Sequence, residues 1–443
     1  MATAARANLS LGVRFAGFYF FLAYAVWPLT VNFFPVGSLP SRIPLVVGAL
    51  MIAVALKQGR PYAFIRKPAQ LFIIFSFFYT ASSVLGPVPP GLYEGVINLV
   101  RIVGIGMALV LTIRSVPDLE FFLRVFVWYG VISSLYGLLF MAPGLNAVGG
   151  ILLSMGLPTG KDPNAMRMTG LLTDPTYFGL SIMPAFLITL HQVLSGVGRR
   201  RSKWLYWRAV AMTVILVLGL LLSFSRTTWA GTAAGVLVLT SLQGKVMRAV
   251  LAFLTITIFL QVAAPDELLE VALSANKDRA TFEINERNDS RSGIWQAYLD
   301  LATVNPFGYG MGSIEYLRQL PTTFAGYGTW SNENPRPHNI YLFIWIEGGA
   351  QTLLPLLGLL WLSVARAWRI RNLVDPVTGI GYSQLAISLL SSMAIGMFGL
   401  GGMLHLFCIT IAIGLVIWYL GVEKKLVHGE WNLLPRFSQR SAA

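Results

Sequence analysis

The sequence is poor in charge and nearly devoid of cysteine. Only 12% of its 443 residues are charged, whereas 55% are hydrophobic and the mean hydropathy is +0.66. A soluble globule needs more polar surface than this composition supplies. The single cysteine, Cys408, excludes an internal disulfide framework and a cysteine metal site. We therefore expect an integral membrane protein.

Apolar runs long enough to cross a bilayer recur along most of the chain. A transmembrane helix needs about 20 mostly apolar residues. Such windows predict spans at residues 15–34, 43–56, 71–87, 94–113, 118–142, 171–191, 209–224, 228–243, 249–264, 339–363, 382–400 and 403–421. Arg6 and Arg14 precede the first run, but no small-residue cleavage site follows, so we expect an uncleaved first helix. The sequence predicts an all-α integral membrane protein with about twelve transmembrane helices.

Basic residues support this layout because they collect in alternate connections. Cytoplasmic connections of membrane proteins carry an excess of Lys and Arg. The basic clusters fall at 57–67, 114–124, 199–208, 245–248 and 366–371, and Lys424 and Lys425 lie beyond the last span. We expect both termini and these clusters to be cytoplasmic. The net charge of +14 then reflects topology and membrane lipids rather than nucleic acid.

The predicted spans divide the chain into four parts. Residues 1–264 hold helices one to nine, residues 339–421 hold helices ten to twelve, and residues 422–443 form a cytoplasmic tail. Residues 265–338 form a large extracytoplasmic loop with more than half of the acidic residues. A loop this long is usually functional or disordered. Apolar residues at helical spacing between Ser290 and Asn305 predict a short helix within it.

His338 is a candidate for acid–base chemistry, because an imidazole titrates near neutral pH, at about 6.5 when unperturbed. It follows Pro335-Arg336-Pro337 and precedes Asn339 at the start of a predicted span, so we expect it at the extracytoplasmic membrane surface. An interfacial polar residue at a helix start is the plain alternative. Arg336 and Asn339 are candidate substrate-binding residues beside it. The other histidines offer no metal-ligand spacing, so we expect no metal and no cofactor.

Two arginines are candidates for binding an anion on the same side of the membrane. Arg226 lies between two closely abutted apolar runs, where a charge needs a partner or reaches for lipid headgroups. Arg291 begins the predicted loop helix, where a guanidinium beside a helix N-terminus favours a phosphate, although a solvated loop arginine is the alternative. Lys161 and Arg167, in the external segment near 143–170, are further candidate substrate-binding residues. Glu347 lies deep in a span, but its spacing from His338 puts it on the opposite helix face.

Three separated motifs resemble those of bacterial O-antigen ligases and of the related O-antigen polymerases. The segment 221–226, Leu-Leu-Ser-Phe-Ser-Arg, resembles the Ser-Arg of that family at a helix junction. The segments Arg291-Ser-Gly-Ile-Trp295 and Asn305-Pro-Phe-Gly-Tyr-Gly310 resemble its Arg-x-x-x-Trp and Asn-Pro-x-Gly-x-Gly patterns. His338-Asn339, with Gly349 and Thr352 beyond, fits the ligase-type His-Asn pattern. Their order and external placement agree with the family, and the twelve-span layout covers nearly the whole chain.

The resemblance implies a metal-independent glycosyltransferase of the multi-span, GT-C-like class. It implies transfer of a glycan from undecaprenyl diphosphate to a sugar hydroxyl of the lipid A core, at the periplasmic face of the bacterial inner membrane. In this interpretation Arg226 and Arg291 bind the diphosphate and stabilise it as it leaves, and His338 is the general base. Inversion by direct displacement is our working hypothesis.

Two other functions remain open from the sequence. An O-antigen or exopolysaccharide polymerase would use the same donor, with a second lipid-linked glycan as the acceptor. A polysaccharide transporter or flippase would show internal repeats, broken helices and carboxylates near the membrane midplane. Glu347 alone is thin support for a transporter.

Overall fold

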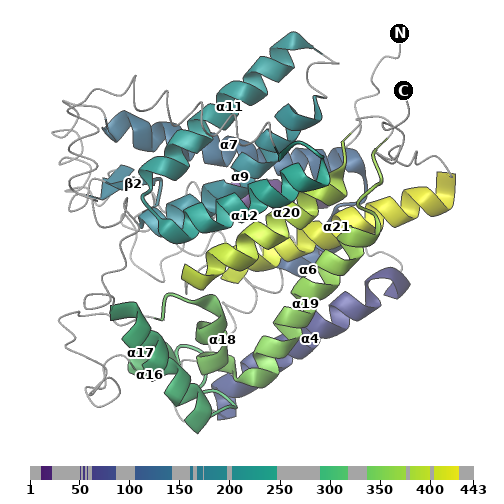
Figure 1. The fold of residues 1–443 in the computed structure, drawn as a ribbon. Coiled ribbons are helices and arrows are strands. Elements are labelled where there is room, and N and C mark those ends of the chain that lie inside the picture. The colour runs from purple at the N-terminus through teal and green to yellow at the C-terminus, as the bar shows by residue number, and fades with distance from the viewer. Residues whose placement is uncertain are drawn as a thin grey trace, which may run out of the picture.

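The computed structural model describes residues 11–21, 50, 53–54, 57, 62–85, 105–141, 160–162, 167–172, 174–196, 202–246, 290–317, 337–375, 380–399 and 404–428. Long helices run side by side in a bundle, and a group of shorter helices lies at one end of it (Figure 1). The helices are α1 (Leu11–Phe21), α4 (Tyr62–Leu85), α6 (Ile105–Thr112), α7 (Val116–Met141), α9 (Pro175–Ser195), α11 (Lys203–Leu222), α12 (Arg226–Leu242), α16 (Ser290–Val304), α17 (Ser313–Leu317), α18 (Ile340–Gly348), α19 (Ala350–Arg369), α20 (Tyr382–Gly396), the 3-10 turn η4 (Met397–Gly399) and α21 (Leu404–His428). Strands β1 (Gly160–Asp162) and β2 (Arg167–Gly170) form a short antiparallel hairpin, which the sequence did not predict.

The helices confirm the expected class of protein. Among the described residues, six helices are long and apolar enough to cross a membrane, namely α7, α9, α11, α19, α20 with η4, and α21. An all-α membrane protein is therefore confirmed. The count of twelve spans and the large external loop stay predictions, and the span expected at 249–264 lies outside the described residues. Helix α21 continues through His428, so the predicted tail begins within a helix.

The span predicted at 339–363 is wrong in one respect, because two helices replace it. Helix α18 ends at Gly348, and Gly349 adopts a left-handed φ of 78° before α19 begins. The Ala350 N–H donates to the Pro306 carbonyl at 2.9 Å, so a distant loop segment occupies the break. The 20 residues of α19 extend about 30 Å and are long enough to cross hydrocarbon by themselves. Helix α18 is therefore not needed to span the membrane.

Small residues allow α12 and α20 to approach closely. A Cβ added at Gly231 would lie 2.7 Å from the Ser392 carbonyl oxygen, and one at Gly235 would lie 2.8 Å from the Ser392 Cβ. The Ser388 hydroxyl donates to the Gly235 carbonyl at 2.7 Å. Small residues spaced by four are the usual basis of close helix packing in membranes. This contact fixes the start of α12 against the end of α20.

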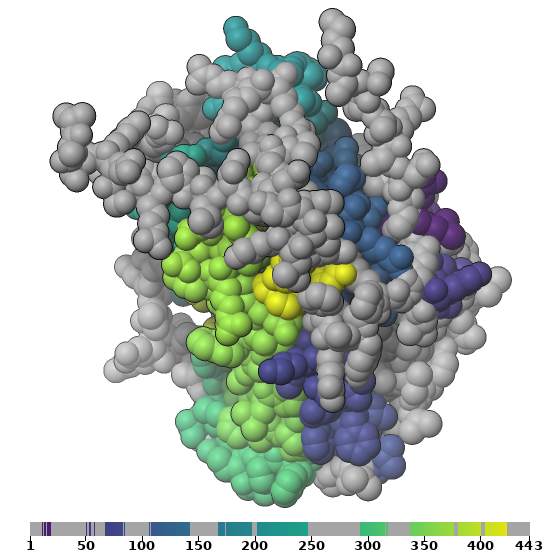
Figure 2. Space-filling model, turned by 90° about the vertical axis from the view of Figure 1, so that its right-hand side faces the viewer, coloured from purple at the N-terminus to yellow at the C-terminus, as the bar shows by residue number. Residues whose placement is uncertain are grey.

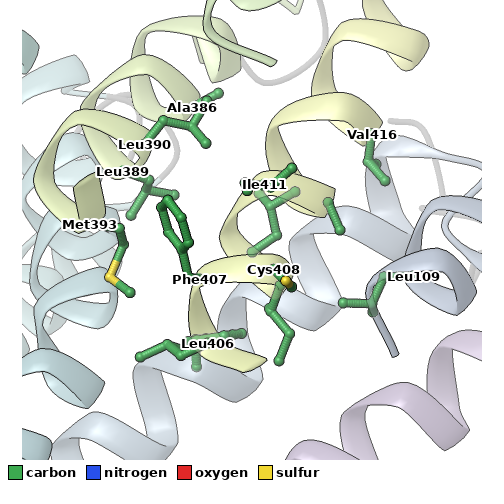
Figure 3. Close-up of a cluster of buried hydrophobic side chains, with 14 of the residues drawn as sticks. Leu109, Ala386, Leu389, Leu390, Met393, Leu406, Phe407, Cys408, Ile411 and Val416 are labelled. Atoms are coloured by element: carbon green, nitrogen blue, oxygen red, sulfur yellow. The ribbon is translucent and has the colours of Figure 1, made fainter. Parts of the chain in front are cut away.

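Helix α21 packs between α20 and α6 and completes the core of the bundle. Figure 3 shows Phe407 of α21 turned towards Leu389 and Met393 of α20, whereas Cys408 points towards Leu109 of α6. All five side chains are buried. Burial of Cys408 makes the thiol poorly accessible to reagents.

Helices α16, α17 and α18 share a second, smaller core. It contains Ile294, Ala297, Tyr298, Ala302, Ile314, Leu317 and Ile346. The group lies at the end of the bundle where α12 and α18 begin, which we call the motif end (Figure 1). Figure 2 shows α4 and α19 side by side above this group, with α16 at the bottom of the view. The predicted helix between Ser290 and Asn305 is present as α16.

Candidate functional site

Arg226 is the first residue of α12 and follows a tight junction with α11. Phe224 adopts a left-handed φ of 45°, which is uncommon for a residue with a side chain. The Ser225 hydroxyl then caps α12 and accepts from the Thr228 hydroxyl at 2.9 Å and from its backbone N–H at 3.4 Å. The junction therefore has a defined conformation, and Arg226 is partly exposed at its end.

Arg167 of β2 holds this junction from the side. Its Nε donates to the Ser223 carbonyl at 3.0 Å, and its Nη2 donates to the Phe224 carbonyl at 3.3 Å. The side chain is only 9% exposed. The sequence suggested that Arg167 binds substrate, and that role stays a prediction. The contacts give Arg167 a different role, which is to fix the turn before Arg226.

His338 precedes α18 in a similar conformation. Its φ is 42°, and the next residue, Asn339, caps α18 through its carboxamide oxygen, which accepts from the N–H groups of Tyr341 and Leu342. Trp295 of α16 donates from its indole Nε1 to the Pro337 carbonyl at 2.6 Å. The loop helix is thus bonded to the backbone next to His338, whose side chain is partly exposed.

The Arg-x-x-x-Trp spacing has a physical explanation in this contact. Arg291 lies in the first turn of α16, four residues before Trp295. Residues four apart lie on the same face of a helix. Trp295 donates to the carbonyl of Pro337, the residue before His338. Position 291 is therefore on the face of α16 that is directed towards the His338 segment.

The glycine-rich segment after α16 secures this arrangement. Gly308, Gly310 and Gly312 all have positive φ, and a Cβ at Gly308 would lie 2.5 Å from the Gly349 nitrogen. The N–H groups of Tyr309 and Gly310 donate to the carbonyls of Ile346 and Glu347 at 2.7 and 3.0 Å. The glycines therefore form a tight turn against the α18–α19 break, as the sequence indicated, and do not form a phosphate loop.

Glu347 joins three elements at the same break. Its carboxylate accepts from the Gly312 N–H at 2.8 Å and from the Tyr79 hydroxyl of α4 at 2.6 Å, and it is 2% exposed. The sequence had separated Glu347 from His338 but gave no sign of its role in holding the loop. Nearby, burial raises the pKa of the Tyr309 phenol, which remains protonated and donates to the Leu301 carbonyl.

The starts of α12 and α18 meet at η4, between α20 and α21. Tyr341, three residues after His338, donates from its hydroxyl to the Ala394 carbonyl at 2.8 Å. Gly399 packs so tightly on Thr227, the residue after Arg226, that no Cβ would fit there. His338 and Arg226 therefore lie at the same end of the bundle, although the sequence separates them widely.

Two further residues were predicted to bind substrate, Lys161 and Arg336. Lys161 lies on β1, opposite Met168 of β2 in the hairpin. Arg336 lies outside the described residues. Within the parts of the chain that the structure describes, no three His, Cys, Asp or Glu side chains gather as metal ligands.

These features define a multi-span helical membrane protein with its motif residues collected at one end. Residues 211–357 match the model of a family described as O-antigen ligase, and this segment contains all three sequence motifs and runs from α11 into α19. The chain thus carries an O-antigen ligase family domain, and the resemblance seen in the sequence is confirmed. Members of this family are glycosyltransferase-like ligases or polymerases. A search of curated proteins found no significant match.

Proposed function

We propose that the protein is an O-antigen ligase. It transfers the O-antigen glycan from undecaprenyl diphosphate to a sugar hydroxyl of the lipid A core, with inversion and without a metal. The motif end then faces the periplasm from the bacterial inner membrane, and both termini are cytoplasmic. The observation that supports this most is the meeting of α12 and α18 at η4, which brings Arg226 and His338 to the same end of the bundle.

The arginines serve the leaving group in this mechanism. When the glycosidic bond breaks, the diphosphate keeps the electron pair, and its charge must be stabilised. Arg226 is the first residue of α12, so its guanidinium and the positive end of the helix dipole act at the same place. Arg291 lies in the first turn of α16 and supplies a second cation. Lys161 and Arg336 are further candidate contacts to the substrate.

His338 serves the acceptor. The acceptor oxygen forms a bond to the anomeric carbon while the bond from that carbon to the diphosphate oxygen breaks. The hydroxyl proton passes to the imidazole, which acts as the general base. Attack from the face opposite the leaving group inverts the anomeric centre. The bonded Trp295–Pro337 contact and the Asn339 cap hold the histidine backbone in position for this step.

The broken helix deserves comparison with transporters, where unwound helices expose backbone groups to an ion or substrate. Here the Ala350 N–H is bonded to the Pro306 carbonyl, and the N–H groups of Tyr309 and Gly310 bond to the end of α18. The Glu347 carboxylate is occupied by Tyr79 and Gly312. The break is thus filled by the protein itself, which favours an enzyme over a transporter.

The acceptor separates a ligase from a polymerase, and a strain without the gene tests it. We expect lipopolysaccharide gels from this strain to show lipid A core without O-antigen, while polymerised glycan remains on the undecaprenyl carrier. Purified protein should also transfer glycan when lipid A core is the only acceptor. Loss of long glycan from the carrier itself, with no transfer to the lipid A core, would identify a polymerase instead.

A further inference from the structure

The turn between α20 and α21 presents an aromatic side chain that the mechanism above does not use. Phe398, in η4, is 50% exposed, although Met397 and Gly399 on either side of it are buried. Large apolar side chains in such turns are usually buried or face lipid. Its surroundings therefore decide what it does.

One side of the Phe398 ring is fixed by the segment that carries His338. Its centroid lies 4.8 Å from that of Tyr341, with the planes at 48°. Tyr341 is itself held by its bond to the Ala394 carbonyl and by an edge contact with Phe407 at 6.3 Å. The Phe398 ring is thus packed on one side against the Tyr341 ring, so it loses little conformational freedom when a ligand binds to its other side.

The other side of the turn is fixed by the segment that carries Arg226. The next residue, Gly399, packs directly on Thr227, which follows Arg226 in α12. The turn with the half-exposed ring therefore contacts both the segment that carries the proposed phosphate-binding arginine and the segment that carries the proposed general base. A glycosyl transfer must place a sugar ring between those two groups.

We propose that Phe398 is a sugar-binding platform. The apolar face of a pyranose ring packs on the phenyl ring, because C–H groups polarised by the neighbouring oxygens are attracted to its negative face. The inference rests on the proposed function and adds a recognition residue to it. The bound pyranose belongs either to the donor, where it is attached to the diphosphate, or to the acceptor, since both sugars present the same C–H face.

A lipid-facing role makes a different prediction. Ile395, about one turn before Phe398, is 41% exposed on the same candidate span. Lipid chains accept leucine as readily as phenylalanine, whereas a sugar face requires the aromatic ring. The comparison of Phe398→Leu with Phe398→Tyr and Phe398→Trp therefore separates the two roles, and Ile395→Ala is the matched control.

The test uses the full-length protein in lipid nanodiscs and measures binding. The donor probes are a prenyl diphosphate with one sugar and the same prenyl diphosphate without it. The acceptor probes are lipid A core with and without its outermost sugar. We expect Phe398→Leu to weaken binding of one sugar-bearing probe by about threefold to tenfold and to leave its sugar-free partner unchanged. The affected pair identifies the donor or the acceptor sugar.

Phe398→Tyr and Phe398→Trp should bind within about twofold of the wild type, and Ile395→Ala should bind normally. Binding by Phe398→Leu that equals the wild type, or that weakens equally for sugar-bearing and sugar-free probes, would overturn the platform. Failure of the proposed function looks different, because the wild type would then bind the lipid-linked sugar without transferring it to lipid A core. Equal melting temperatures for all variants verify that folding is unaffected.

Discussion

Two motif residues, Phe224 and His338, have the same kind of backbone strain. Phe224 and His338 are left-handed residues with side chains, and each directly precedes a helix cap, Ser225 or Asn339. A left-handed residue other than glycine costs about 1–2 kcal/mol. Strain of this size persists where surrounding contacts fix the backbone, and it concentrates at functional sites. Here Arg167 and Trp295 provide those contacts.

Replacement of His338 tests the general base. We expect His338→Ala to lower the transfer rate by about 10²–10⁴-fold while donor affinity is kept, because the base acts on the acceptor hydroxyl. His338→Gly is the matched control, since it also lacks the imidazole but relieves the left-handed strain. Both variants should be equally slow in a purified assay. Normal turnover in either variant, or loss of donor binding in both, would show that His338 is not the general base.

Replacement of the arginines tests the diphosphate site. Arg291→Lys keeps the charge but loses the planar guanidinium, so transfer should fall while the protein level stays unchanged. The transfer rates of Arg291→Ala and Arg226→Ala should fall further, by about 10²–10³-fold, as expected when a group that stabilises developing charge is lost. Transfer assays with quantified protein measure this. If both alanine variants worked nearly normally, the diphosphate would have to be bound elsewhere.

Replacement of Arg167 distinguishes its structural role at the Arg226 junction from the substrate-binding role suggested by the sequence. Arg167→Met leaves the Ser223 and Phe224 carbonyls without their donor, and bonds to a charged group contribute about 1.5–3 kcal/mol each. We expect a lower melting temperature together with weaker donor binding, because the Arg226 junction loosens. Unchanged thermal stability with weaker substrate binding would instead support direct contact with substrate.

At the scale of elements, the sequence predicts helices well and interruptions poorly. Hydrophobic length alone located α7, α9, α11, α12, α20 and α21 to within a few residues at most ends. It failed at Gly349, because α18 and α19 are both apolar and together form one continuous window. The break depends on the 306–310 segment docking against it, and no local pattern reveals a contact between such distant residues.

The glycine turn offers a test of this docking with an internal control. Gly308→Ala places a Cβ 2.5 Å from the Gly349 nitrogen at a φ of 87°, whereas Gly196→Ala, at a φ of 65°, meets nothing within 4 Å. The second change costs only the left-handed strain of about 1–2 kcal/mol. We expect Gly308→Ala to lower the melting temperature more and to reduce transfer sharply. Similar effects of the two changes would mean that the turn does not hold α18.

At the scale of the whole molecule, orientation is the prediction that everything else depends on. Gln296→Cys lies on an exposed face of α16, and Lys203→Cys is exposed at the start of α11. The native Cys408 is buried, so it gives little background. In intact cells with a permeabilised outer membrane, an impermeant thiol reagent should label position 296 and reach position 203 only after lysis. The reverse pattern would invert the topology.

The assembled site could be predicted only in part. Residue chemistry and the family motifs selected Arg226, Arg291 and His338, because charge beside a membrane-spanning run is conspicuous in a sequence. The contacts that bring them together involve Tyr341, Gly399 and Trp295. Nothing in the local sequence distinguishes Tyr341 or Gly399 from core residues. Trp295 belongs to the Arg-x-x-x-Trp pattern, but that pattern gives no sign of its bond to the Pro337 carbonyl.

The break at Gly349 also bears on how the site responds to the thickness of the bilayer. A transmembrane helix follows a thicker or thinner membrane by changing its tilt. In an unbroken helix over 339–363, each change of tilt would swing His338 away from Arg226. Because the chain is interrupted, we expect α19 to tilt about Gly349 while Tyr341 and the Tyr309–Gly310 segment hold α18 in place. The geometry needed for chemistry is thereby separated from the dimensions of the membrane that contains it.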